Sequence, residues 1–141
     1  MDIIEKKTYL CKMKTENKTL MKTEKQTKGI AGEELAVNHL LGKGYRIFER
    51  NWRCGHLEVD IIAGIDDYLV IVEVKTRKNS RNGAPEDFVV RQKQRNLIRA
   101  ANYYISFKGI RKEVRFDVVS VLLGDGVEEV RHIEDAFKPV W

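Results

Sequence analysis

The sequence predicts a single α/β domain built on a mixed central β-sheet. Three observations point to this class. The 141 residues are a usual length for one domain. Apolar residues recur at helical spacing in two segments and fill five shorter runs that have strand character. These segments follow the order helix, three strands, helix, two strands, which is typical of an α/β or α+β fold with a mixed sheet.

The first 28 residues form a lysine-rich segment that differs in composition from the rest of the chain. They carry eight lysines against four acidic residues, so most of the net charge of +5 lies here. Because so polar a segment cannot form a core, residues 1–28 are predicted to be a basic tail that is flexible or loosely helical, ahead of a domain over residues 29–141. The tail either attracts phosphates or is a solvated leader. Met21 is a candidate start of translation, which would make the first twenty residues an artefact.

The first structured element is predicted to be a helix of roughly 12 residues that begins near Thr27 or Gly29. The glycines at positions 42 and 44 end it. At 100° per residue, Glu33 falls in the middle of the apolar arc of this helix. Glu33 is then either a rim glutamate paired with a lysine or a carboxylate that points into the same cavity as Asp60.

Three strands are predicted next, over Tyr45–Arg53, Leu57–Ala63 and Tyr68–Lys75. The first is expected to lie at an edge of the sheet. Four polar and turn-forming residues separate the second run from the third, so these two strands are expected to be antiparallel neighbours in a hairpin.

Two polar pairs interrupt the apolar strands of this hairpin. Side chains alternate along a strand, so Glu58 and Asp60 share one face, and Glu73 and Lys75 share one face. Neighbouring strands lie about 4.8 Å apart, so Asp60 and Glu73 can reach one divalent ion when both face the same side. Charges buried among apolar side chains cost several kcal/mol or more, and a metal ion or a reaction offsets that cost.

The segment after the hairpin is a hydrophilic loop over Thr76–Asp87, long enough to suggest contact with a substrate. A basic helix is predicted to follow over roughly Val90–Phe107. Lys93 lies near the edge of its apolar arc and is expected to reach inward at the N-terminal end. The other cations of this helix form either a solvated face or a phosphate-binding track.

The C-terminal part of the chain contains two further predicted strands, over Val114–Leu122 and Val127–Ile133, joined by a tight glycine turn. The segment Ala136–Trp141 is apolar enough to pack back on the sheet. His132 falls in the last strand and is expected to be a surface or packing residue.

The chemistry of the hairpin favours a hard divalent cation. Asp60 and Glu73 supply oxygen ligands, which suit Mg²⁺ or Mn²⁺ rather than zinc. A protonated Lys75 beside them can orient a water molecule and offset charge that develops on a phosphate. An Asp followed by Glu-x-Lys on the next strand is the minimal set for metal-dependent hydrolysis of a phosphodiester.

The compartment follows from what the chain lacks. It has two cysteines, no apolar segment near the roughly 20 residues needed to span a bilayer, and no apolar core of a signal peptide in its first 30 residues. We therefore expect a cytoplasmic protein without a membrane partner.

Seven short motifs are spread along the chain: Gly29-Ile-Ala-Gly32-Glu33, Asn51-Trp-Arg53, Glu58-Val-Asp60-Ile-Ile, Val72-Glu73-Val74-Lys75, Lys93-Gln-Arg95, Arg115-Phe-Asp117-Val-Val and Asp135-Ala-Phe137. As a set, these motifs resemble the bacterial YraN-like family of predicted endonucleases. This family belongs to the restriction-endonuclease-like PD-(D/E)XK nucleases and is similar to archaeal Holliday junction resolvases. Val59 stands where the family pattern has proline, and Leu57 where it usually has glycine; neither change removes a functional group.

The resemblance implies a restriction-endonuclease-like fold and a set of site residues. Asp60 and Glu73 take the positions of metal ligands, Lys75 that of the residue on the attacking water, and Glu33 that of an ancillary carboxylate. Glu58 is implied to be a neighbour of the site, with Lys93 in support. The implied substrate is DNA, with branched or junction DNA as one form, and junction resolvases act as pairs, so a homodimer is also expected. The alternative is a non-catalytic nucleic-acid-binding or interaction module that kept the fold and its charges.

Overall fold

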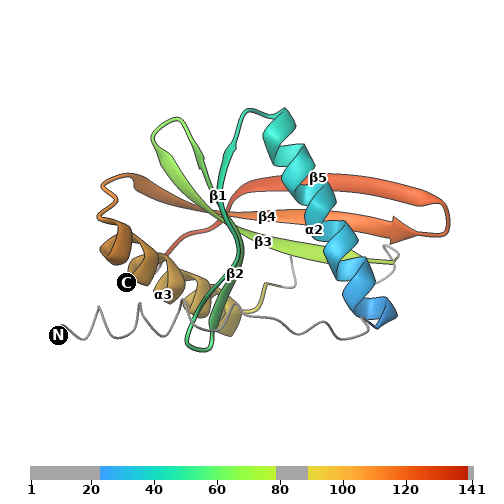
Figure 1. Ribbon diagram of the computed structural model, residues 1–141, viewed down its shortest axis with the longest axis horizontal. Helices are drawn as coiled ribbons and strands as arrows, with labels where there is room; N and C mark the ends of the chain where they lie inside the picture. The colour runs from blue at the N-terminus through green and yellow to red at the C-terminus, as the bar shows by residue number, and fades with distance from the viewer. Residues whose placement is uncertain (1–22, 79–88, 140–141) are drawn as a thin grey trace.

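The computed structural model describes residues 23–78 and 89–139 (Figure 1). The predicted tail up to residue 22, Met21 included, and most of the predicted loop after the hairpin lie outside these residues. The described elements, in chain order, are α2 (Glu24–Gly42), β1 (Arg46–Cys54), β2 (Leu57–Ile65), β3 (Tyr68–Arg77), α3 (Arg91–Lys108), β4 (Glu113–Gly124) and β5 (Val127–Phe137).

The described strands form one five-stranded sheet in the order β1-β2-β3-β4-β5. β3 and β4 are parallel and are connected through α3, whereas the other neighbours are antiparallel. The predicted mixed sheet, the β2–β3 hairpin and the edge position of β1 are therefore confirmed. Parallel neighbours need a long crossover, which α3 supplies.

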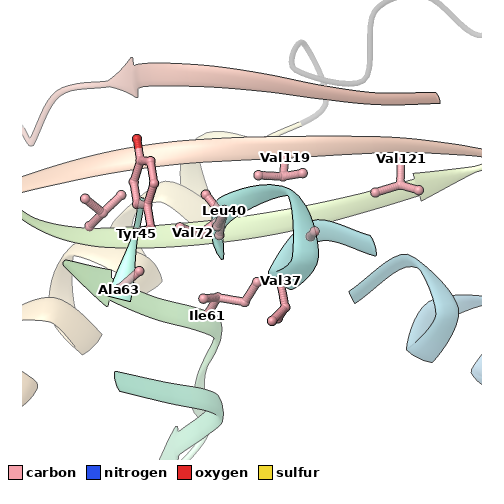
Figure 2. Close-up of a cluster of buried hydrophobic side chains, with 10 residues drawn as sticks. Val37, Leu40, Tyr45, Ile61, Ala63, Val72, Val119 and Val121 are labelled. Carbon is pink, nitrogen blue, oxygen red and sulfur yellow. The ribbon is translucent and has the colours of Figure 1, made fainter. Parts of the chain in front are cut away.

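The two helices cover opposite faces of the sheet, because alternate strand residues belong to two separate cores. Val37 and Leu40 of α2 pack with Ile61, Val72 and Val119, as Figure 2 shows. On the other face, buried residues of α3 pack against the strands; this second core includes Leu97, Ala101, Tyr104, Leu57, Ile62, Ile71 and Phe116. The sheet is thus buried on both sides, with α2 in blue to cyan and α3 in gold in Figure 1.

Helix α2 begins earlier than predicted, at Glu24, so the end of the predicted tail 1–28 belongs to the helix. A capping box explains this start. The amide of Gln26 donates to the hydroxyl of Thr23, and the amide of Thr23 donates to the side chain of Gln26. These reciprocal bonds satisfy two of the amides that a helix start leaves without intrahelical partners.

A buried polar cluster joins β4 to β5. The Arg115 guanidinium donates two hydrogen bonds to Asp117, of 2.9 and 2.8 Å, and Nε2 of His132 lies 2.8 Å from Asp117 Oδ2. The amide of Asp135 donates to the same carboxylate. Burial acts to raise the pKa of Asp117, but the hydrogen bonds from His132 and Arg115 outweigh it, so that the pKa is lowered. His132, whose side chain is 1% exposed, is thus a packing residue.

The C-terminal strand runs further than predicted, to Phe137, because its last residues pair with the start of β4. The rings of Phe116 and Phe137 stack with their centroids 5.0 Å apart. The predicted packing of the C-terminal segment on the sheet is confirmed for this residue. No helix in the described ranges is both long and apolar enough to cross a membrane.

Candidate active site

Strands β2 and β3 separate at the point where the two predicted carboxylates lie. Their ladder ends at the pair Ile61 and Val72, and the next residues outward are Asp60 on β2 and Glu73 on β3. Beyond this point β2 continues beside β1, and β3 continues beside β4. Asp60 and Glu73 are therefore neighbours at the base of a fork in the sheet.

The backbone of β3 holds Asp60 in this fork. The amide of Val74 donates a hydrogen bond of 2.8 Å to Oδ2 of Asp60. The carboxylate thus serves as acceptor for an amide that has lost its neighbour in β2. Burial raises the pKa of Asp60, although the Val74 hydrogen bond and the charge of Lys93 act in the opposite direction.

Glu73 is a buried carboxylate beside two lysines. It is 5% exposed. Its Oε1 lies 3.6 Å from Nζ of Lys75, and its Oε2 lies 3.7 Å from Nζ of Lys93 in the first turn of α3. These distances are those of ion pairs and exceed hydrogen-bond length. Within the described part of the chain, Oε2 is buried and accepts no hydrogen bond.

The environment of Glu73 disfavours its charged form. Burial raises its pKa to about 7, and the charge of Asp60 contributes in the same direction, while Lys93 and Lys75 oppose the change. Both Asp60 and Glu73 therefore have raised pKa values. A cation at this position would relieve the repulsion between the two carboxylates and replace part of their lost hydration.

Glu33 approaches Asp60 from helix α2. The two side chains line one pocket of about 630 Å³ together with Val74 and Thr76 of β3. Burial raises the pKa of Glu33, a hydrogen bond with Asn51 lowers it, and the charge of Asp60 raises it further. Of the two alternatives that the sequence leaves open for Glu33, the geometry matches a carboxylate in the cavity of Asp60.

A close approach of α2 to β3 sets the position of Glu33. A Cβ atom added to Gly32 would lie 2.0 Å from Oγ1 of Thr76 and 3.1 Å from its Cβ. Any larger residue at position 32 would clash with the Thr76 side chain, so either that side chain or the helix would have to shift. The glycine of this motif is therefore explained by helix–strand packing beside the site.

Asn51 is a site residue to which the sequence alone assigned no role. It lies in β1 across from Asp60, between the pairs Arg50–Ile61 and Trp52–Val59. Its φ is 50°, in the left-handed region that Asn tolerates better than most residues. Its side chain hydrogen-bonds Glu33. An Asn inside a run of strand formers was the available signal, because Asn is rare in strands.

The two supporting residues of the prediction differ in their contacts. Glu58 forms an ion pair of 3.4 Å with Arg53, both largely solvent-accessible, and its charge contributes to the raised pKa values of Asp60 and Glu33. Lys93 reaches inward to Glu73. The structure thus brings Lys93 into the site and leaves Glu58 at its margin.

Two carboxylates, rather than a larger cluster, form the centre of the site. In residues 23–78 and 89–139, no group of three or more His, Cys, Asp or Glu side chains is arranged to hold a metal ion. Mg²⁺ and Mn²⁺ are compatible with such a pair, because they commonly bind one or two protein carboxylates and complete their shell with water and substrate phosphate. The arrangement suits an ion that binds together with an anionic substrate.

The sequence is similar to a protein family and to several of its members. The sequence profile of the uncharacterised protein family UPF0102 matches residues 32–121, a range that contains all the predicted site residues. A UPF0102 protein of Syntrophomonas wolfei is 46% identical over 110 residues, which are 77% of this chain and 96% of the relative. One from Bacteroides thetaiotaomicron is 45% identical over 111 residues, 79% of this chain and 92% of the relative. One from Phocaeicola vulgatus is 42% identical over 114 residues, 80% and 94% respectively.

Proposed function

The chain belongs to the uncharacterised protein family UPF0102, the YraN family, and from that premise we propose that it is a divalent-metal-dependent endonuclease acting on DNA. The observation that carries the proposal is the buried Oε2 of Glu73, which accepts no hydrogen bond from the described residues and is a neighbour of Asp60. A carboxylate kept in this state is costly to the fold. Binding of a cation offsets this cost.

Asp60 and Glu73 fit Mg²⁺ or Mn²⁺ by their chemistry. Both are hard oxygen donors, and burial raises the pKa of each by more than the nearby hydrogen bonds and lysines lower it. When bound, the ion supplies Lewis-acid polarisation of the scissile phosphate and makes an adjacent water more acidic.

The lysines hold positive charge where a phosphodiester gains negative charge during hydrolysis. Lys75 shares a strand face with Glu73 and is proposed to orient the attacking water through Nζ. Lys93 reaches the other oxygen of Glu73 from α3 and is proposed to neutralise charge on the phosphate. Glu33, half-buried in the pocket of Asp60, is proposed as an ancillary proton acceptor.

The substrate and assembly parts of the proposal come from the family resemblance. Junction resolvases cut two strands and act as symmetric pairs, so we include branched DNA as a substrate and a homodimer as the acting form.

A cleavage assay tests the function. End-labelled linear duplex, single-stranded, flapped and four-way DNA are incubated with the full chain in Mg²⁺, in Mn²⁺ and in chelator. We expect metal-dependent products from at least one substrate, and a loss of at least about 100-fold in Asp60→Asn and Lys75→Ala. Asn at position 60 keeps an acceptor for the Val74 amide, and Glu129→Gln, an exposed position on β5, is the matched control. If none of the four substrates gives products, the proposed nuclease function is rejected in favour of a non-catalytic binding module.

A further inference from the structure

Helix α3 carries positive charge without any compensating acid. Its 18 residues include five cations, Arg91, Lys93, Arg95, Arg99 and Lys108, and neither Asp nor Glu. Solvent-exposed helices usually contain both acidic and basic residues, since Glu–Lys pairs three or four residues apart add stability. The composition of α3 therefore departs from that of an ordinary solvated face.

The three arginines of α3 form one stripe along the helix, here called the arginine stripe: Arg91, Arg95 and Arg99. They are four residues apart, so they follow one another at about 6 Å intervals along the helix axis. All three are exposed, whereas Leu97 and Ala101 between and beyond them are buried against the sheet. The stripe thus lies on the face of α3 that points away from the sheet.

The arginine stripe is unfavourable for the helix itself. Like charges four residues apart repel one another. Arg91 is the first residue of the helix, where the helix dipole favours an anion, and the first turn contains no acidic residue. Within the described residues, the contact of Arg95 is a 3.5 Å hydrogen bond to Gln92, and no carboxylate pairs with any of the three. An external anion would relieve this arrangement.

Lys93 connects the arginine stripe to the candidate active site. It lies in the same first turn of α3 as Arg91 but points to the opposite side, where it meets Glu73. The body of the helix, about 10 to 12 Å across, separates the stripe from the sheet. One phosphate cannot contact both surfaces, so an anion that occupies both must be extended and repeat its charges.

We propose that Arg91, Arg95 and Arg99 bind the phosphate backbone of a DNA duplex segment that flanks the scissile bond. This inference rests on the proposed function, since Glu73 and Lys93 mark where the bond is cut. Duplex DNA matches the arginine stripe in charge and in length, because each strand carries a negatively charged phosphate about every 3.4 Å along the duplex axis and the stripe spans about 12 Å. The stripe contributes to binding and takes no part in bond cleavage.

Salt-dependent binding without divalent metal tests the proposal separately from cleavage. Fluorescence anisotropy measures the Kd of the full chain for a duplex of about 30 base pairs between about 50 and 200 mM NaCl. The test variant is Arg91→Gln with Arg95→Gln and Arg99→Gln. The matched control is Arg46→Gln with Arg111→Gln and Lys112→Gln, which removes the same charge from exposed residues at the end of the sheet where β2 turns into β3.

Loss of three phosphate contacts is expected to reduce the slope of log Kd against log salt by about 2.7. Over this salt range the Kd of the wild type then rises about 40-fold more than that of the stripe variant. The control variant with three substitutions is expected to keep the wild-type slope to within about 0.9, which is the contribution of one phosphate contact. Thermal melting of the stripe variant should be at or above that of the wild type, because repulsion is removed.

Equal slopes for the wild type and the stripe variant, or an equal reduction in the control variant, would overturn the proposal while leaving the proposed nuclease function in place. Conversely, a stripe-dependent slope in a protein that cleaves none of the four DNA forms would support the stripe and reject the nuclease.

Discussion

Replacement of Glu73 by glutamine is expected to make the metal-free protein more stable at alkaline pH. Glutamine keeps the size of the side chain but cannot ionise. Glu73 is 5% exposed, and its pKa is raised to about 7, mainly by burial and secondly by the charge of Asp60. The wild type must therefore hold a disfavoured charge above this pH, whereas the variant holds none.

The size and sign of the effect follow from proton linkage. In the unfolded chain Glu73 has the ordinary glutamate pKa of 4.5, so between pH 4.5 and about 7 the native state keeps a proton that the unfolded state has released. Stability of the wild type consequently falls as pH rises through this window. At 1.36 kcal/mol per pKa unit, the penalty reaches about 3 kcal/mol above pH 7 and is under about 1 kcal/mol at pH 5.

Urea denaturation in the presence of chelator measures this difference. The free energy of unfolding is compared for the wild type, Glu73→Gln and the exposed control Glu129→Gln at pH 5 and pH 8. Glu73→Gln should exceed the wild type by about 2 to 3 kcal/mol more at pH 8 than at pH 5, and the control should show no such pH dependence. If the gain of Glu73→Gln is the same at both pH values, the charge at Glu73 is not disfavoured by the fold and the reasoning is wrong.

Three further outcomes are expected. The affinity for Mn²⁺ should rise with pH up to about 7 and then level off, since protons compete at Glu73, whose pKa is about 7; calorimetry between pH 6 and 8 checks this, and a flat profile would contradict it. Gly32→Ala should lower the free energy of unfolding by about 1 to 3 kcal/mol through its clash with Thr76. Adding Thr76→Ala should recover part of this loss in denaturant melts, whereas strict additivity would reject the contact. Asp117→Asn should destabilise the protein by about 3 kcal/mol or more because it leaves Arg115 without its buried partner, yet the cleavage rate of the folded fraction should be unchanged; a selective loss of cleavage would place Asp117 in the site.

The order of elements and the hairpin that carries Asp60 and Glu73 were predictable from local patterns. Strand alternation and the short polar turn between two apolar runs predict antiparallel neighbours. The register that brings Asp60 next to Glu73 was only a condition of the prediction, and the structure supplies it. The fork at Ile61 and Val72 was not predictable, because it depends on which neighbour each strand keeps, β1 for β2 and β4 for β3.

Other features depend on contacts between distant segments. Gly32 is required by Thr76 of β3, and Asn51 hydrogen-bonds Glu33 from β1. Contacts between residues so far apart in the chain cannot be identified from a single sequence. The early start of α2, in contrast, depends on a local signal, the capping pair Thr23 and Gln26. This signal was missed because the residues around it are polar and read as part of the tail.

The central claim is that Asp60 and Glu73 form one divalent-cation site, and calorimetric titration with Mn²⁺ at pH 8 tests it most directly. The full-length wild type, Asp60→Asn, Glu73→Gln and the control Glu129→Gln are titrated under identical conditions. We expect the wild type and the control to bind with equal affinity, and each site variant to bind at least about tenfold more weakly. Equal binding by the wild type and both site variants would contradict the claim.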